Sequence, residues 1–380
     1  MNTRICVAHV ITQLELGGAQ QNTLHTVEHL NRERFAPALL TGPGGELEPR
    51  ARALRDLAFF SIPHLLRPIA PASDLRALQE LTWALSRAPR PLLVHTHSSK
   101  AGVLGRLAAR AAGADAVVHS VHGFAFHEGQ TAAKRGAFTM AERLAAPLAD
   151  AYICVSRADL ERGQRLGLFG AARVELIRSG IVFDQFRYRD EDRRRIRTEL
   201  SIPADAPVIG TVANFKPQKA PLDFVAVAAR ALDARPQARF IYVGDGALRP
   251  EVERAARAAR IQDRLHLVGW QRDVAAYLSA IDVFLLTSHH EGLPRSVLQA
   301  LTSGCAVVAT RTGGPDEVVD PELLAAPGDL AGLCARVLTA LDRPRRSRAA
   351  LPLPAHLRGF SADRMVLDQE RLYRELIERR

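Results

Sequence analysis

The stretch from 288 to 319 carries the side chains and spacing with the clearest chemical meaning in this chain. An apolar run ends at its start, and Glu291 lies in the turn that follows. Gln299 comes eight residues later, about two helical turns away if the spacing is fully helical. A second apolar run then leads to Gly313 and Gly314. Because a glycine-rich turn that opens a helix suits a phosphate or another anion, this stretch predicts an anion-binding site.

Residues that could hold a metal ion are present, but their spacing is unconvincing. His95 and His97 resemble a metal pair, yet they occupy alternate strand positions next to Lys100, so we expect them to shape a loop. The run 289–291 (HHE) has no third ligand at a suitable distance along the chain. The run 190–192 (DED) lies in a charged stretch and is typical of a solvated linker. We therefore expect no metal ion and no cofactor.

Two series of alternating strands and helices must position these residues. Apolar runs of strand length alternate with helical periodicity in the first half, and the alternation starts again after residue 205. Such alternation predicts parallel sheets with helices on both faces, where ligands bind beyond the carboxyl ends of the strands. We expect two doubly wound α/β domains, joined by a charged stretch near 187–200. The predicted strands are 4–12, 36–41, 91–96, 115–121 and 151–155 in the first series, and 207–213, 239–244, 264–269, 282–288 and 305–310 in the second.

Composition narrows the class of protein and of partner. The 380 residues are 47% hydrophobic and 24% charged, which argues against disorder. The 51 Lys and Arg residues outnumber the 41 Asp and Glu residues, giving a formal net charge of +10. Codon bias explains the many arginines, and an anionic partner such as a nucleotide-sugar, an acidic polymer or a membrane surface is a compatible reading. The basic residues are spread along the chain, so we expect no nucleic-acid partner.

Cysteine usage and hydropathy predict the compartment. The four cysteines are far apart in apolar stretches and form no CxxC pair, as in a reducing compartment. The N-terminus lacks the pattern of a signal peptide, and no apolar run reaches the roughly 20 residues that cross a bilayer. We expect a cytoplasmic protein, either free or peripheral on the inner face of the membrane. The segment 134–143 would either touch an anionic membrane or form a solvated helix face.

The order and spacing of the motifs resemble the retaining GT-B glycosyltransferases of family 4, in the branch of cell-surface and exopolysaccharide enzymes. The run 288–319 is similar to the Glu-x7-Glu signature of that family. The resemblance covers nearly the whole chain, through GGAQ, VHTHSSKAGVLGR, VVHSVHGFAFHEGQ, ICVS, IRSGIVFDQF, IGTVANFKPQKAPLDF, YVGDGALRPEVE and LVGWQRDV. It implies the GT-B fold, two Rossmann-like domains facing across a cleft. The expected parts are an acceptor-side domain at 1–186, a nucleotide-sugar domain at 187–360, and a helix at 361–380 packing back on the first domain.

The resemblance also implies a role for each matching position. Glu291 would contact hydroxyls of the donor sugar, Lys219 would stabilise the leaving diphosphate, and His122 would lie beside the reacting sugar. A departing nucleoside diphosphate develops negative charge that a cation must meet, and Lys219 can do so without a divalent ion. The other implied donor-binding positions are Gly17, Gly18, Asn214, Lys216, Gly244, Trp270, Arg272, Gly292, Leu293, Gln299, Gly313 and Gly314, and the implied acceptor-binding positions are Lys100, His127 and Glu128.

Two positions depart from the family pattern. Asn214 stands where the family usually has Arg, and Lys216, two residues further on, could supply the missing charge because alternate strand residues share a face. Gln299 replaces the second Glu, although an amide can still hydrogen-bond two ribose hydroxyls as donor and acceptor. The same two changes would also suit a protein that binds a donor without turning it over.

The expected function is transfer of a hexose-type sugar from a nucleoside diphosphate sugar, with UDP favoured over GDP, to a hydroxyl acceptor with retention of configuration. The acceptor would be a glycan or a lipid-linked molecule in glycan, polysaccharide or glycolipid biosynthesis. Two alternatives remain open. One is a non-catalytic partner that binds nucleotide-sugar or glycan beside an active transferase, and the other is a GT-B nucleotide-sugar epimerase.

Overall fold

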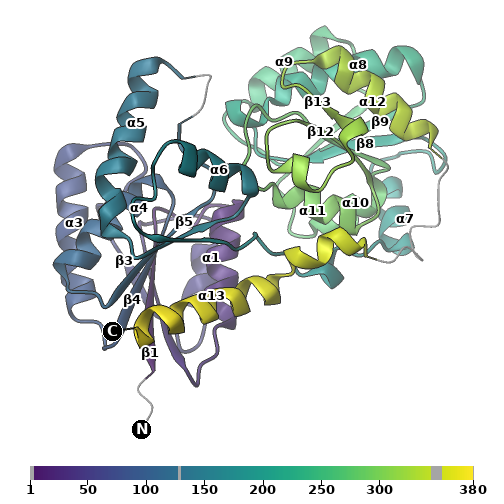
Figure 1. Ribbon diagram of the computed structural model, residues 1–380. Coiled ribbons are helices and arrows are strands. Elements are labelled where there is room, and N and C mark those ends of the chain that lie inside the picture. The colour runs from purple at the N-terminus through teal and green to yellow at the C-terminus, as the bar shows by residue number, and fades with distance from the viewer. Residues whose placement is uncertain (1–3, 127–129, 344–352, 380) are drawn as a thin grey trace. The chain divides into compact units, whose positions relative to one another are not determined.

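The computed structural model describes residues 4–126, 130–343 and 353–379. Contacts within the chain group it into two compact units. The first unit comprises Met1–Gly180 together with Ala362–Arg380, and the second comprises Ile181–Ser361. Each unit is built on a parallel sheet with helices on both faces (Figure 1), which confirms the α/β class expected from the alternating pattern.

Parallel strands form the sheet of the first unit: β1 (Ile5–Ile11), β2 (Phe35–Thr41), β3 (Ala58–Ser61), β4 (Leu92–His97), β5 (Ala116–Val121), β6 (Ala151–Cys154) and β7 (Arg173–Leu176). They form a seven-stranded sheet in the order β3-β2-β1-β4-β5-β6-β7. Five of these strands were expected from apolar runs. The edge strands β3 and β7 were missed because each has only four residues and neither is fully buried.

Helices cover both faces of this first sheet: α1 (Gly18–His29), α2 (Glu48–Arg52), α3 (Pro71–Ser86), α4 (Ser99–Ala111), α5 (Ala132–Ala145), α6 (Arg157–Arg165) and α13 (Ala362–Glu378). Ala8 of β1 points to the core that α3 and α4 share, whereas its neighbour Val7 points to the core that contains α13. This alternation follows from the two-residue period of a strand. Figure 1 shows α13 lying beside α1, and Glu370 of α13 accepts a hydrogen bond from the backbone N–H of Asn31 at 2.7 Å.

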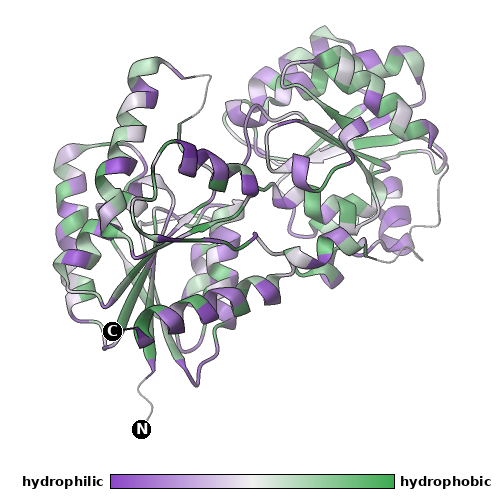
Figure 2. Cartoon of the chain, viewed as in Figure 1, coloured by the Kyte–Doolittle hydropathy of each residue, from purple (hydrophilic) through white to green (hydrophobic). Residues whose placement is uncertain are grey.

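The second unit repeats the pattern with shorter strands: β8 (Val208–Val212), β9 (Arg239–Val243), β10 (Leu265–Gly269), β11 (Val283–Leu286), β12 (Ala306–Thr310) and β13 (Leu324–Ala325). They form a six-stranded sheet in the order β10-β9-β8-β11-β12-β13. Figure 2 shows hydrophobic colours along the strands and hydrophilic colours on the outer helix surfaces. The helices of this unit are α7 (Asp190–Glu199), α8 (Pro221–Ala234), α9 (Arg249–Ala258), α10 (Val274–Ala280), α11 (Arg295–Thr302) and α12 (Leu330–Asp342).

The charged stretch near 187–200 was expected to be a linker, but residues 190–199 form helix α7 of the second unit. Arg193 and Arg197 of this helix lie 3.0 and 2.9 Å from the carboxylate of Asp282. The same carboxylate accepts the backbone N–H of Val208 at the start of β8. The linker expectation was wrong because the arginines pair with a half-buried carboxylate, and these ion pairs hold the helix against the second unit. The three acidic residues of the DED run occupy the first turn of α7, where their negative charge interacts favourably with the helix dipole.

The strand order reverses beside the first strand of each sheet. In the first unit β1 is flanked by β2 and β4, and in the second unit β8 is flanked by β9 and β11. The loops that leave such neighbouring strands in opposite directions open a crevice at the carboxyl edge, where ligands bind in open α/β sheets. Most of the residues selected from the sequence follow the strands of these two switch points.

In the part of the chain that the structure describes, no helix combines the length and the apolar character needed to pass through a bilayer.

Candidate active site

An ion pair joins the loops that follow the two central strands of the second unit. Lys219 ends a short 3-10 turn, η3 (Pro217–Lys219), after β8, and Glu291 lies in the loop after β11. Lys219 Nζ lies 2.5 Å from Glu291 Oε1, and the side chains are 21% and 6% exposed. Ser288 Oγ donates a hydrogen bond of 2.6 Å to the same carboxylate oxygen. The structure thus holds a cation and a nearly buried carboxylate together at the switch point.

Hydrogen bonds between the two loops fix this pair. Thr287 Oγ1 donates to the carbonyl oxygens of Lys219 and Ala220, both at 3.0 Å. Gln218 Nε2 donates to the carbonyl of His290 at 2.9 Å, and the carbonyl of Gln218 accepts from the N–H of His289 at 2.8 Å. Because both loops are held at several points, the ammonium and carboxylate are positioned before any ligand arrives.

The glycines of the signature bring a third loop against Glu291. Gly313 forms a parallel bridge with Glu291, so Lys219, Glu291 and Gly313 converge on one region of the second unit. Gly313 has a φ of +98°, and a Cβ added to Gly314 would overlap the carbonyl of Gly292. These positions require glycine because the backbones approach too closely for a side chain.

The turn after these glycines differs from the sequence-based expectation. The expected helix is only a 3-10 turn, η4 (Pro315–Glu317), and the N–H of Gly313 donates to the carboxylate of Asp316 at 2.9 Å. The carboxylate of Asp316 thereby takes up an N–H that an anion would otherwise use. The turn therefore packs closely beside Glu291. It does not present the open helix N-terminus that was expected to bind an anion.

The remaining positions of the signature lie on or before α11. Leu293 is buried, and Gln299 is 7% exposed within the helix. Arg295 is also in this helix, where burial lowers the pKa of its guanidinium to about 10. Sequence reasoning passed over Arg295 and Ser288. Both could have been selected from the sequence by their position in the motif, because Ser288 comes just before the acidic turn and Arg295 just after it.

The residues after β8 frame the same region. Phe215 is fully buried, and its neighbours Asn214 and Lys216 are both half-buried. These residues follow the end of β8 at Val212, and the N–H of Lys216 donates to the carbonyl of Asn214 at 2.8 Å. The expectation that strand alternation places both side chains on one face was therefore wrong, because the backbone turns here. Gly244 has a φ of +137°, and a Cβ there would overlap the carbonyl of Ala213.

Two expected donor contacts lie further along the sheet edge. Trp270 and Arg272 follow β10, and β9 separates that strand from β8. Trp270 is 41% exposed, and Arg272 is exposed as well. The structure therefore places them at the same carboxyl edge as Lys219 and Glu291 but not in the ion-paired group.

In the first unit, histidines from three adjacent strand ends form a hydrogen-bonded chain. His9 Nδ1 lies 3.0 Å from His97 Nε2, and His97 Nδ1 lies 3.1 Å from His122 Nε2. Burial lowers the pKa of His9 to about 3 and holds that of His97 well below its ordinary value, with neighbouring imidazoles adding to the shift for His97. His9 and His97 are therefore neutral at physiological pH, and each offers one N–H and one lone pair.

The donor and the acceptor of each hydrogen bond between these histidines can be assigned. Among the residues that the structure describes, His9 Nε2 has no hydrogen-bond partner. A buried N–H without a partner is rarer than a buried lone pair without one, so His9 carries its hydrogen on Nδ1. His9 then donates to His97, and His97 Nδ1 donates to His122 Nε2. The chain thereby fixes His122 as the tautomer with its hydrogen on Nδ1.

His95 packs against His97, with 4.1 Å between the ring centroids, and forms hydrogen bonds of its own to the C-terminal helix and to β5. His95 Nδ1 lies 2.6 Å from the hydroxyl of Tyr373 on α13, and His95 Nε2 lies 2.8 Å from Ser120 Oγ. The ligand atoms of His9, His95 and His97 all lie within 4.8 Å of one another, a spacing that a metal ion could use. Both ring nitrogens of His95 and of His97 already have protein hydrogen-bond partners. His95 and His97 thus lie inside the core and do not shape a loop.

The other first-unit candidates lie nearby in the fold. Gly17 is the N-cap of α1 in an extended conformation and Gly18 is its first residue. The loops after β1 and β4 are joined by Thr12 Oγ1 and Ser98 Oγ, 2.8 Å apart. Lys100 Nζ donates to the carbonyls of Leu66 and Pro68 at 2.7 and 2.5 Å.

Lys100 also forms an ion pair with Asp74. Three protein partners match the three donors of an ammonium, so the structure gives Lys100 a role in joining α4 to the segment before α3. Its contact with an acceptor stays a prediction. His127 and Glu128 lie outside the described residues.

Comparison with known proteins agrees with this arrangement. The model of a glycosyl transferase 4-like domain matches residues 17–180, and that of glycosyl transferases group 1 matches residues 206–343. The chain is 31% identical over 325 residues to an Escherichia coli UDP-Gal:alpha-D-GlcNAc-diphosphoundecaprenol alpha-1,3-galactosyltransferase, covering 84% of this chain and 83% of that protein. The chain therefore belongs to the retaining GT-B glycosyltransferases of family 4, the glycosyl transferases group 1.

Solved structures show the same fold at low sequence identity. Anabaena HepE in complex with UDP and glucose is 18% identical with a TM-score of 0.80, over 98% of this chain and 100% of that chain. The sucrose-phosphate synthase of Thermosynechococcus elongatus is 21% identical with a TM-score of 0.84, over the whole of both chains. These likenesses confirm the GT-B fold that the sequence motifs implied.

Proposed function

We propose that the protein transfers a hexose from a UDP-sugar to a hydroxyl acceptor in polysaccharide or glycolipid biosynthesis. The observation that supports this most directly is the 2.5 Å contact of Lys219 Nζ with Glu291 Oε1 at the switch point of the second unit. The choice of UDP rests on the relatives, since the Escherichia coli enzyme is named for UDP-Gal and HepE was solved with UDP and glucose.

Lys219 supplies the charge that the leaving group requires. When the bond between the anomeric carbon and the donor phosphate breaks, the nucleoside diphosphate takes the electron pair and gains negative charge. The ammonium stabilises that charge where it develops, and Lys216 adds a second cation three residues earlier in the chain. In this proposal the two lysine side chains meet the developing charge, so the step requires no divalent ion.

Glu291 and His122 act on the sugar in this proposal. Glu291, held by Lys219 and Ser288, accepts hydrogen bonds from donor-sugar hydroxyls and sets the orientation of the ring. His122, fixed as the Nδ1–H tautomer by His97, offers an N–H to the reacting sugar. A neutral donor at that point binds a hydroxyl without opposing the positive charge that develops on the sugar ring in the transition state.

The two units take separate substrates in this proposal. The second unit holds the nucleotide-sugar through the residues after β8, β11 and β12, and the first unit receives the acceptor. The histidine network of the first unit contributes His122 to the reaction. The acceptor is a glycan or lipid-linked molecule, and the protein works in the cytoplasm or on the inner face of the membrane.

The test is a transfer assay with a panel of UDP-sugars and GDP-sugars. We expect one UDP-sugar to be consumed, with the product showing by NMR the same anomeric configuration as the donor. Lys219→Ala and Glu291→Ala should each lower the rate at least a hundredfold while leaving the melting temperature within a few degrees of the parent. If both variants turned over at the parent rate, the assignment of Lys219 and Glu291 to the active site would be wrong.

The same assay separates the alternative functions. Asn214 and Gln299 stand where the family usually has charged residues, which favours a binding partner without activity as the second candidate. That candidate predicts UDP-sugar binding in a thermal-shift titration with no transfer and no hydrolysis. An epimerase would instead yield an altered nucleotide-sugar in the absence of any acceptor.

A further inference from the structure

Helix α5 of the first unit presents large apolar side chains to solvent. Met140 is 51% exposed and Leu144 is 73% exposed, and Ala133 and Ala137 are exposed as well. Along the chain these four residues are spaced by four, three and four positions, so they lie in one line on the helix surface. We call this line the apolar stripe of α5.

The face of α5 that enters the core carries a charge. Glu142 and Ala145 are the buried residues of this helix. The carboxylate of Glu142 lies 2.7 Å from Nη2 of Arg106, a fully buried residue of the neighbouring helix α4. A helix on the surface of a globular domain usually turns apolar side chains inward and charged side chains outward. Helix α5 departs from this rule, because a carboxylate occupies its buried face while the apolar stripe faces solvent.

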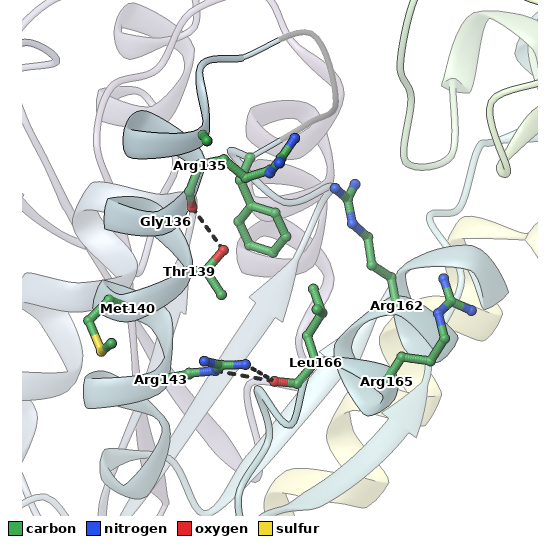
Figure 3. Close-up of a pocket in the computed structure, with 10 residues that line it drawn as sticks. Arg135, Gly136, Thr139, Met140, Arg143, Arg162, Arg165 and Leu166 are labelled. Carbon is green, nitrogen blue, oxygen red and sulfur yellow. Dashed lines mark hydrogen bonds between the residues drawn. The ribbon is translucent and has the colours of Figure 1, made fainter.

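Cations border the apolar stripe on both sides. Lys134 comes one residue after the start of the stripe and Arg143 one residue before its end, and both are exposed. Because one residue turns a helix by about 100°, the two cations lie on opposite flanks of the stripe. Figure 3 shows Arg143 extending from α5 toward α6, whereas Met140 points to the other side of the helix.

The charge that α4 and α5 present outward is positive. Helix α4 contains no acidic residue, and the acidic residue of α5, Glu142, is buried and paired with Arg106. Figure 1 shows α5 next to α4, where Leu107 is a further exposed apolar side chain. The outer surface of these two helices therefore combines apolar side chains with cations.

Opposite charge selects the partner of this surface. An apolar helix face bordered by cations is typical of a helix that lies in the interface of an anionic bilayer, with its apolar side chains among the acyl chains and its cations at the headgroups. A second copy of the chain would instead bring the same cations together, and each copy has a formal net charge of +10. The sequence left the segment 134–143 open as a membrane contact or a solvated face, and the apolar stripe favours the membrane.

We propose that the first unit attaches to an anionic membrane through the apolar stripe of α5, with Lys134 and Arg143 at the lipid phosphates. Helix α13 covers the opposite face of the same sheet and remains in water. The inference goes beyond the proposed function, because it concerns a surface and not the donor or the acceptor. Attachment can therefore be measured without either substrate.

The first experiment places a fluorescent label on each face of the first unit. The four native cysteines are buried, so Met140→Cys in the full chain can be labelled selectively with an environment-sensitive NBD group. Leu367→Cys, at a position on α13 that is 62% exposed, is the matched control. With vesicles of equal parts phosphatidylcholine and phosphatidylglycerol, we expect a blue shift and at least a twofold rise in emission from the label at position 140. The label at position 367 should not change.

The second experiment measures affinity by sedimentation with the same vesicles. Met140→Ser/Leu144→Ser should weaken binding at least tenfold, because the two large side chains of the stripe no longer enter the bilayer. Both positions are exposed, so the melting temperature should stay within a few degrees of the parent. Lys134→Gln should weaken binding to these vesicles about fivefold and have little effect on vesicles of phosphatidylcholine alone. Leu367→Ser should bind like the parent.

Three outcomes would overturn the proposal. The first is a parent protein that does not bind the anionic vesicles. The second is equal vesicle binding by the parent and the double serine variant, or an unchanged emission of the label at position 140. The third is a parent that sediments as a dimer in buffer while the double variant is a monomer, which would assign the stripe to an interface between copies. Turnover of a nucleotide-sugar tests the proposed function separately from all three.

Discussion

His97 lies between two other imidazoles, and its tautomer follows from that of His9. It accepts from His9 and donates to His122, so the state of a candidate catalytic residue is set by a neighbour that is almost fully buried. A positioning residue of this kind affects the chemistry without touching the substrate.

We expect His97→Ala to lower kcat about tenfold to a hundredfold with little change in the KM for the donor, because His122 would no longer be held as one tautomer. His97→Gln should recover part of the rate, since an amide can accept through its oxygen and donate through its nitrogen. Steady-state kinetics with the accepted UDP-sugar measures both values. Equal kcat in the alanine variant and the parent would show that the hydrogen bond from His97 has no effect on the chemistry of His122.

The buried histidines also predict how stability depends on pH. The pKa of His9 falls to about 3 by burial, and those of His95, His97 and His119 are held well below their ordinary value by the same cause. An unfolded histidine binds a proton near pH 6.5, whereas the folded ones do not. Stability is therefore fully present above about pH 6.5 and is lost as the pH falls from there toward 3.

The slope is about 1.4 kcal/mol per pH unit for each such histidine once the pH is well below 6.5. Urea unfolding at pH 7.5, 6.0 and 5.0 should show a steep fall in the free energy of unfolding across the lower two values. His9→Asn should reduce that slope by the contribution of one histidine, about 1.4 kcal/mol per pH unit. A free energy that stays constant from pH 7.5 to 5.0 would contradict the neutral, buried state of the cluster.

At the scale of elements, the loops after β8, β11 and β12 must approach one another to within backbone contact. Gly314 is where this approach is tightest, because any Cβ would meet the carbonyl of Gly292. We expect Gly314→Ala to weaken UDP binding at least tenfold and to destabilise the second unit by about 1–3 kcal/mol through overpacking. Gly359→Ala is the control, since nothing lies within 4 Å of a Cβ there. Thermal shift with and without UDP measures both effects, and equal behaviour of the two variants would show that the contact is relaxed easily.

The same elements show what could be predicted from sequence. The long buried strands and the order of the motifs were sufficient for the α/β class and the family, because apolar runs and glycine turns are local signals. The charged helix α7 was missed, since its stability comes from Arg193 and Arg197 meeting Asp282 across more than eighty residues of sequence. The turn after Gly314 was expected to be a full helix because sequence spacing does not reveal that Asp316 accepts the N–H of Gly313.

The candidate site follows the same division. The sequence motifs named Lys219, Glu291 and Gly313, and the structure brings these three together. The roles given to them stay predictions. The histidine chain of the first unit was not foreseen, since His9, His97 and His122 come from three separate strands and become neighbours only when β1, β4 and β5 pair side by side.

At the scale of the whole molecule, the last helix belongs to the first unit. Met365, Val366, Leu372, Tyr373 and Leu376 of α13 are all buried in the core with Val7 and Phe35. At about 1.5–3 kcal/mol for each buried side chain, their loss would match the total stability of a typical domain, about 5–15 kcal/mol.

We therefore expect a chain ending at Ser361 to lose the fold of its first unit while the second unit still binds UDP. Removing α13 also takes away the Tyr373 hydroxyl that lies 2.6 Å from His95. Circular dichroism, limited proteolysis and UDP titration would separate the two units. Protection of residues 4–126 from protease in the truncated chain would show that α13 is dispensable for the first unit.

This arrangement has a consequence during synthesis. A ribosome that adds about 5–20 residues per second needs roughly 10–40 seconds to make the second unit. For all of that time the strands of the first unit have emerged but lack the helix that seals one face of their sheet. The nascent chain must therefore keep an apolar surface from associating wrongly until Ala362–Arg380 has been synthesised and has left the exit tunnel.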